Sequence, residues 1–241
     1  LAEMVPTFPC VTSPIQASMW TGTSPCEHGV IANGFYDRAK RDVLFWVGGN
    51  DKIAGESVWD AARRSFDVTA AVWHGQNIKG ASCDYIVTPA PIHEADGTTK
   101  LWCYSKPESL YSELLSALGH FPLQHYWGPI SGIQSTNWIL EGAAWLVEHR
   151  APNLQWVYLP HLDYAGQKFG PNSPQAKAAL ADLDAALARF AEKCLGFAGV
   201  SGADFLVVGE YAMTDVNRVV FPNRVLREAG GLTVQVQDGR E

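Results

Sequence analysis

Two kinds of apolar pattern alternate along this chain. Short, continuous apolar runs favour strands, and segments with apolar residues at every third or fourth position favour helices. The predicted strands lie at 68–73, 84–88, 154–159 and 204–208, and the predicted helices lie at 57–64, 108–118, 137–149 and 175–195. This alternation predicts an α/β fold with a mostly parallel central sheet and helices on both faces. No repeat or interdomain linker stands out, so we expect a single domain over 1–241.

A short helix is predicted close to the start of the chain. Ser13 can cap it, Pro14 suits its first turn, and Gly22 can end it. Thr12 then lies just ahead of the helix, with its hydroxyl near free backbone N–H groups. Such a helix end attracts phosphate and stabilises an alkoxide, although by itself this position is equally that of an ordinary loop threonine at a helix start.

Carboxylates follow the last two predicted strands. His161 and Asp163 come after 154–159, and Glu210 comes after 204–208. Open parallel sheets place ligands at the carboxyl ends of their strands. If the first of these strands continues to Asp163, the side chains of His161 and Asp163 point to one face. His161 is then either a metal ligand or a hydrogen-bonded structural histidine.

Several short motifs carry a family resemblance. The first group is Val11-Thr12-x-Pro14, Thr21-Gly22, Glu27-His28-Gly29 and Asn33, which stands twenty-one positions after Thr12. It resembles the type I phosphodiesterase/nucleotide pyrophosphatase family of the alkaline phosphatase superfamily. Later motifs are similar to a bacterial branch described as alkaline phosphatase family proteins, and they are Trp127-Gly-Pro129, Tyr158 to Tyr164, Phe169-Gly-Pro171 and Gly209 to Ala212. The resemblance implies an alkaline phosphatase-like fold.

The same resemblance implies an active site. Thr12 would be the nucleophile and form a phospho-threonine, and Asn33 would bind a phosphoryl oxygen. Two divalent ions about 4 Å apart would activate the nucleophile. Zinc is the ion that the resemblance favours, and one ion would contact the Thr12 alkoxide.

The ligand positions implied by the resemblance are altered in this chain. Asp163 matches an aspartate, but Gln167 stands where a histidine is expected. Glu210 and Tyr211 stand where an Asp-His pair is expected. Carboxylates without imidazoles favour Mn²⁺ or Mg²⁺ over zinc. His161 could supply the missing imidazole.

These residues predict a metal-dependent hydrolase of phosphodiester or pyrophosphate bonds in a small phosphate ester. Phosphomonoesters, phosphonates and sulfate esters remain open as substrates. The alternative is a non-catalytic relative with a degraded metal site and a binding or scaffold role. A third hypothesis is a metal-free lyase or transferase that uses Thr12 and Cys10, although we expect Cys10 to be buried as a small hydrophobe.

The composition excludes some partners. The formal net charge is −7 and the sequence pI is about 5.5, which argues against a nucleic-acid polymer. No apolar run reaches the length of a membrane span. The chain begins within a motif that the resemblance places after a first strand, so we expect a fragment that lacks this strand and a C-terminal part. Compartment stays open, with the cytoplasm slightly favoured over the periplasm, as does oligomeric state.

Overall fold

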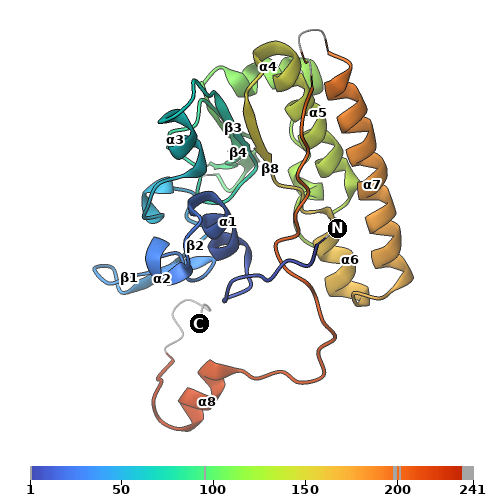
Figure 1. The fold of residues 1–241 in the computed structure, drawn as a ribbon. Coiled ribbons are helices and arrows are strands. Elements are labelled where there is room, and N and C mark those ends of the chain that lie inside the picture. The colour runs from blue at the N-terminus through green and yellow to red at the C-terminus, as the bar shows by residue number, and fades with distance from the viewer. Residues whose placement is uncertain (1, 95, 198–199, 201, 235–241) are drawn as a thin grey trace.

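The computed structural model describes residues 2–94, 96–197, 200 and 202–234. A four-stranded sheet forms its centre, in the order β7-β4-β3-β8 (Figure 1). The strands are β3 (Ala70–Trp73), β4 (Tyr85–Pro89), β7 (Cys103–Lys106) and β8 (Leu154–Val157). β3 pairs in parallel with β4 and β8, and β7 runs antiparallel to β4. The prediction of a mostly parallel sheet is therefore confirmed.

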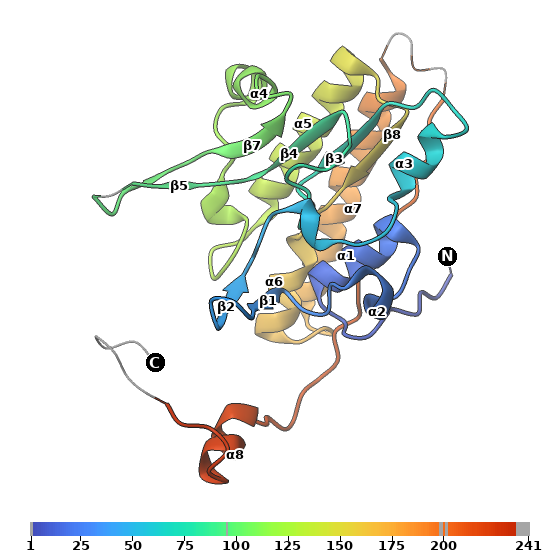
Figure 2. The same cartoon turned by 90° about the vertical axis from the view of Figure 1, so that its left-hand side faces the viewer.

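Helices cover both faces of this sheet (Figure 2). One face carries α4 (Leu110–Leu118) and α5 (Ile133–Arg150), and the other carries α1 (Thr12–Thr21) and α3 (Val58–Arg63). Outside α5 lie α6 (His161–Phe169) and α7 (Pro174–Leu195). No helix in the described part of the chain is long and apolar enough to span a membrane.

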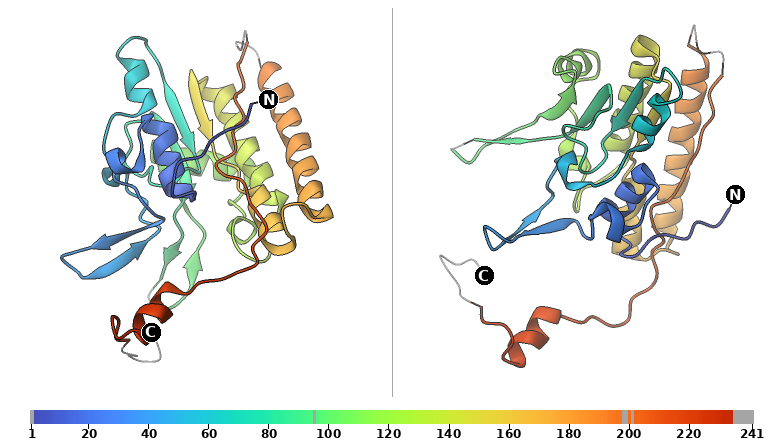
Figure 3. Two further views of the ribbon diagram at one scale, coloured as in Figure 1. Left: turned by 60° about the horizontal axis from the view of Figure 1, so that its bottom comes forward. Right: turned by 60° about the vertical axis from the view of Figure 1, so that its left-hand side comes forward.

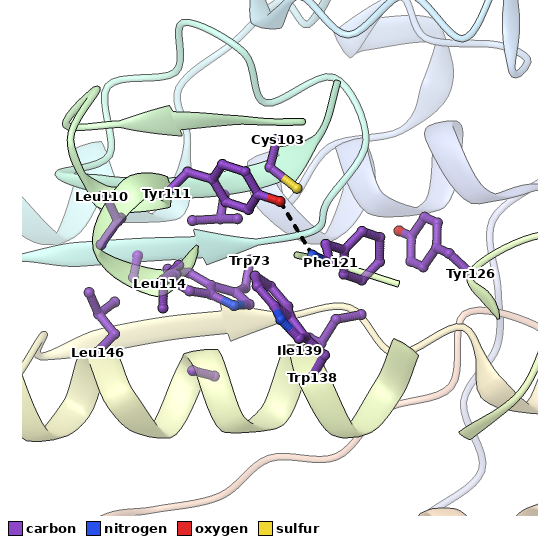
Figure 4. Close-up of a cluster of buried hydrophobic side chains, with 13 residues drawn as sticks. Trp73, Cys103, Leu110, Tyr111, Leu114, Phe121, Tyr126, Trp138, Ile139 and Leu146 are labelled. Carbon is purple, nitrogen blue, oxygen red and sulfur yellow. Dashed lines mark hydrogen bonds between the residues drawn. The ribbon is translucent and has the colours of Figure 1, made fainter. Parts of the chain in front are cut away.

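The side chains of strand β3 contribute to two hydrophobic cores, one on each face of the sheet. Successive strand side chains point to opposite faces. Ala71 and Trp73 pack with α4 and α5, whereas Ala70 and Val72 pack towards α1 and α3. Figure 4 shows the first core, in which Trp73 lies among Leu114, Trp138 and other buried side chains. All four β3 residues are buried, so this strand fixes the distance between the two helical layers.

The remaining elements are short and lie at the periphery. They are α2 (Pro25–His28), β1 (Gly34–Asp37), β2 (Asp42–Phe45), η1 (Asn50–Lys52), β5 (Ile92–His93), β6 (Thr99–Lys100), η2 (Leu123–His125) and α8 (Pro222–Glu228). β1 and β2 form one antiparallel hairpin, and β5 and β6 form another. α8 stands away from the sheet and its helices (Figure 3).

Two helices begin earlier than predicted. α1 begins at Thr12 itself, with Val11 as the extended residue before it, and Ser13 lies inside the first turn. α5 begins at Ile133 after Gly132, so Thr136 is a buried residue within the helix and not its cap. In α5 the hydroxyl of Ser135 donates to backbone carbonyls, one of them that of Gly132, and this allows the turn before Thr136 to be helical.

The predicted strand at 204–208 is wrong. The described residues from 202 to 221 contain no helix or strand, and they follow the helical layer as an irregular trace before turning away to α8 (Figures 1 and 3). The side chains of Leu206 and Val207 are 88% and 70% exposed. Strand propensity reflects packing on a half-buried sheet, and 204–208 has no such packing here because β8 pairs with β3 alone among the described strands.

Candidate active site

Helix α1 places two polar side chains on one face. Thr12 and Gln16 are four positions apart, so they lie one above the other on the helix surface. Thr12 is 8% exposed and Gln16 is fully buried. Gly22 ends the helix in the left-handed conformation, as predicted, with φ of 66°. A short, capped helix therefore holds a threonine hydroxyl and an amide side by side in a mostly buried position.

Glu210 meets both of these side chains. Gln16 Nε2 donates a hydrogen bond to Glu210 Oε1, and the Thr12 hydroxyl lies close enough to the Glu210 carboxylate to lower its pKa. Burial raises the pKa of Glu210 to about 7, although the hydrogen bond from Gln16 opposes the rise. The nearby charge of Asp163 adds to the rise. Glu210 therefore changes its charge close to neutral pH, next to a hydroxyl group.

Tyr211 joins Thr12 to Asp163. The Tyr211 hydroxyl lies 3.1 and 3.2 Å from Asp163 Oδ1 and Oδ2 and donates to this carboxylate. It also lies close enough to the Thr12 side chain for Thr12 to lower the pKa of Tyr211. Burial raises the pKa of Asp163, and the hydrogen bond from Tyr211 partly offsets this. Burial likewise raises the pKa of Tyr211, which keeps its proton at neutral pH. The structure thus brings Thr12, Asp163, Glu210 and Tyr211 together.

Asn33 lies at the start of α1. Its Oδ1 accepts a hydrogen bond of 3.0 Å from the backbone N–H of Ser13. Because Pro14 has no N–H, two of the first three helix positions offer no backbone donor to an anion. The sequence-based expectation of free N–H groups at this end is therefore only partly met. With its oxygen engaged, Asn33 has its amide N–H groups left as donors.

His161 is not placed as the strand argument expected. The chain turns into α6 at His161, so β8 does not continue to Asp163 and the shared-face argument is wrong. His161 Nε2 lies 3.9 Å from Asp182 of α7, and burial lowers the pKa of His161. Gln167, one helical turn after Asp163, is exposed. A metal-binding role for His161 stays a prediction without its original geometric support.

The donors of the site are all oxygens. Asp163 and Glu210 supply two carboxylates, and Thr12 and Tyr211 supply two hydroxyls. Across the residues that the structure describes, no three His, Cys, Asp or Glu side chains form a group that could hold a metal. This donor set does not fit a pair of zinc ions, whose usual protein sites include histidine or cysteine. Carboxylate and hydroxyl oxygens are the donor type that hard cations such as Mn²⁺ or Mg²⁺ prefer, but these side chains alone make an incomplete ligand set.

Sequence reasoning missed Gln16 and misplaced Cys10. Gln16 could have been found from its four-residue spacing to Thr12, because this spacing puts both on one helix face. Cys10 is exposed, not buried, and its Sγ donates to the carbonyl of Thr7 at 3.3 Å. Cys10 thus faces solvent two residues before α1.

Fold and site together define a class of protein. It is an α/β protein in which a threonine at a helix start lies near two half-buried carboxylates, Asp163 and Glu210, that follow the sheet in the chain. The chain belongs to the type I phosphodiesterase / nucleotide pyrophosphatase family, whose model matches residues 1–240. The fold is alkaline phosphatase-like, as predicted.

The individual proteins that resemble this chain share low sequence identity with it. A Schizosaccharomyces pombe (strain 972 / ATCC 24843) protein described as an uncharacterized pyrophosphatase/phosphodiesterase is 24% identical over 205 residues, which are 78% of this chain and 33% of that protein. Crystal structures of phosphonoacetate hydrolase from Sinorhizobium meliloti 1021, in complex with phosphonoformate and with phosphonoacetate, superpose with TM-scores of 0.52 and 0.53 at 16% identity. Each covers 78% of this chain and 44% of the hydrolase. The chain therefore spans less than half the length of these relatives.

Proposed function

We propose that the protein hydrolyses phosphodiester or pyrophosphate bonds in small phosphate esters, with Thr12 as the nucleophile. The observation that carries this proposal is the approach of the Thr12 hydroxyl to the Glu210 carboxylate in a buried setting. The family supports the reaction class. The phosphonates bound to the Sinorhizobium meliloti hydrolase keep phosphonates open as a second substrate class.

The chemistry follows from the contacts of Thr12. Glu210 accepts the hydroxyl proton while Thr12 Oγ1 forms a bond to phosphorus. The bond from phosphorus to the leaving-group oxygen breaks, and this oxygen takes the proton that Glu210 accepted. In the second step a water gives a proton to Glu210 while its oxygen bonds to the phosphorus of the phospho-threonine. The bond from phosphorus to Thr12 Oγ1 then breaks, and the proton on Glu210 returns to Thr12. A base acts best when its pKa is close to the working pH, and a pKa of about 7 for Glu210 meets that condition.

Neighbouring side chains orient the reactants. Asp163 accepts a hydrogen bond from the Tyr211 hydroxyl, which fixes the ring with its oxygen near Thr12. The Asn33 amide N–H groups are donors for a phosphoryl oxygen near the start of α1. Asp163 would hold a divalent cation, and Glu210 would be its second carboxylate ligand in the steps in which Glu210 carries no proton. When bound, such a cation supplies positive charge that stabilises the phosphoryl oxygens.

The test is turnover of a chromogenic phosphodiester by the protein at its natural length, in separate assays with Zn²⁺, Mn²⁺ and Mg²⁺. We expect Thr12→Ala to lose at least about a thousandfold in kcat/KM, because an acting nucleophile has no local substitute. Thr21→Ala, at the other end of α1, is the matched control and should keep wild-type turnover within about threefold. Equal turnover in Thr12→Ala and wild type would refute the proposal.

One observation favours a second candidate, the non-catalytic relative. Tyr211 stands at a position where the family resemblance implies histidine, and its hydroxyl already joins Thr12 and Asp163. A site whose donors satisfy one another can persist without a metal. A folded protein that turns over none of the substrate classes named here with any of the three metals, and that binds no Mn²⁺, would support this candidate.

A further inference from the structure

A buried amide connects the proposed nucleophile to the sheet. The side chain of Gln16 is fully buried, and both of its ends are hydrogen-bonded. Its Oε1 accepts from the backbone N–H of Gln76 at 2.7 Å, and its Nε2 donates to Glu210 Oε1. A backbone N–H can only donate, so the bond from Gln76 fixes the orientation of the amide. The NH₂ group of Gln16 therefore has to face Glu210.

The loop that holds Gln16 is itself fixed. Gln76 follows β3, the central strand, by three residues. Beside it, Gly75 packs so closely on Trp20 of α1 that a Cβ atom at Gly75 would lie 2.7 Å from the Trp20 ring. Trp20 stands one helical turn beyond Gln16, on the same face as Thr12 and Gln16. The close contact between Gly75 and Trp20 thus sets the distance at which Gln16 reaches the loop.

Glu210, in contrast, has no secondary structure to position it. It lies in the irregular segment after residue 202, where the described backbone forms neither helix nor strand. Its position relative to Thr12 therefore depends on side-chain contacts, and the hydrogen bond from Gln16 is the contact that links it to α1 and β3 together.

We propose that Gln16 is a positioning residue, whose amide holds the Glu210 carboxylate against the Thr12 hydroxyl. This inference rests on the proposed function of Thr12 and Glu210. Gln16 needs no contact with substrate to act. Its loss should lower the rate of the chemical step and leave substrate binding nearly unchanged, because Glu210 would no longer be held beside Thr12 while the groups that contact substrate stay in place.

The first measurement compares kcat and KM of two variants with those of the wild type. Gln16→Met keeps the size of the side chain and removes both hydrogen bonds. We expect kcat to fall at least about tenfold with KM within about twofold, since small displacements of a reacting group have effects of this size. Ser18→Ala is the matched control, because Ser18 lies in the same helix as Gln16 and its hydroxyl contacts His28 of α2. This variant should keep wild-type kcat.

The second measurement is independent of activity. Gln16→Glu places two carboxylates together and should lower the thermal unfolding midpoint when residue 210 is Glu. In the Glu210→Gln background the same change restores a hydrogen bond with its direction reversed, so the midpoint should fall much less. Equal falls in both backgrounds would show that the two side chains do not interact, and would overturn the proposal.

The outcomes separate the two proposals. If Gln16→Met keeps wild-type kcat while Thr12→Ala is inactive, the positioning role is wrong and the nucleophile stands. If Thr12→Ala keeps wild-type turnover, the proposed function is wrong, and with it the catalytic part of the role of Gln16. Circular dichroism of each variant confirms that a fall in kcat comes from folded protein.

Discussion

At the scale of single residues, the site gathers groups that resist ionisation. Burial raises the pKa values of Glu210, Asp163 and Tyr211 together. A carboxylate with a raised pKa is less favourable in the folded chain than in water. The site therefore lowers the stability of the protein at neutral pH.

Glu210→Gln tests this cost. The pKa of Glu210 is higher in the folded state than the ordinary value of 4.5, so stability falls as pH rises from about 4.5 to about 7 and stays lower above it. The neutral variant avoids this loss. We expect it to unfold with a free energy about 1–3 kcal/mol higher than wild type at pH 8, and with a much smaller difference at pH 4.5.

Urea unfolding at the two pH values, in the presence of a metal chelator, measures this difference. A pH-independent difference between Glu210→Gln and wild type would contradict the assignment of a raised pKa to Glu210.

Residue chemistry could be predicted further than residue geometry. The motif around Thr12 and the carboxylates at Asp163 and Glu210 were visible in the sequence, and the structure brings all three together. The position of His161 was not predictable from strand periodicity, because the pattern cannot show where β8 gives way to α6. Gln16 was missed because an amide on a short helix carries no motif.

At the scale of elements, packing decided where local propensity was ambiguous. The helices at 57–64 and 175–195 lie within one residue of their predicted bounds, because Ser57 and Ser173 accept hydrogen bonds at their N-termini. The strand at 204–208 failed although its residues favour β structure. Capping is a local interaction that sequence reveals, whereas a strand needs a neighbour that sequence does not locate.

The cap of α7 gives a direct prediction. Ser173 Oγ accepts from the backbone N–H of Ala176 at 3.1 Å. Ser173→Ala leaves this donor unpaired in the protein and should lower the unfolding free energy by about 1 kcal/mol. Ser173→Asp retains an acceptor and should restore most of the loss in a chemical denaturation experiment. Equal stability of Ser173→Ala and Ser173→Asp would mean that a hydrogen-bond acceptor at this position does not stabilise α7.

The contact between α1 and the loop after β3 gives a second prediction about stability. A Cβ atom at Gly75 would lie 2.7 Å from the Trp20 ring and 3.2 Å from Ile78 Cγ2, and all these groups are buried. Gly75→Ala should therefore lower the unfolding free energy by about 1–3 kcal/mol, the usual cost of overpacking. Gly202→Ala, at an exposed glycine with open space around it, should change it by less than about 0.5 kcal/mol.

Thermal unfolding followed by circular dichroism compares these two glycine variants. An unchanged midpoint in Gly75→Ala would mean that α1 can shift away from the loop without cost.

At the scale of the whole molecule, the sheet and its helices hold a long irregular tail. Phe205 contacts Phe190 of α7 edge-on, with ring centroids 6.1 Å apart, and Met213 lies directly on the backbone of α6 at Gly166. Beyond Met213 the described tail is almost entirely exposed, α8 included (Figure 3). A single domain over 1–241 remains a proposal, because this tail packs on the rest of the molecule only over its first part.

Limited proteolysis tests this division. Exposed backbone with few contacts opens at little cost, so we expect the first cleavages at 214–221 and later ones in α5 or the central sheet. Mass spectrometry of the fragments locates the cuts. A first cut between 133 and 157 would show that the tail packs more firmly than the central sheet.

Glu210 and Tyr211 also attach the tail to the part of the molecule that contains the sheet, through their hydrogen bonds to Gln16 and Asp163. A ligand that binds Thr12, Asp163 and Glu210 at once would contact both the tail and the part of the molecule that contains the sheet. By linkage, the free energy of that binding is added to the attachment of the tail. A saturating phosphate ester or divalent ion should therefore slow proteolysis of the tail at 214–221, away from Thr12, Asp163 and Glu210. Conversely, a change that attaches the tail more firmly should raise the affinity for the ligand.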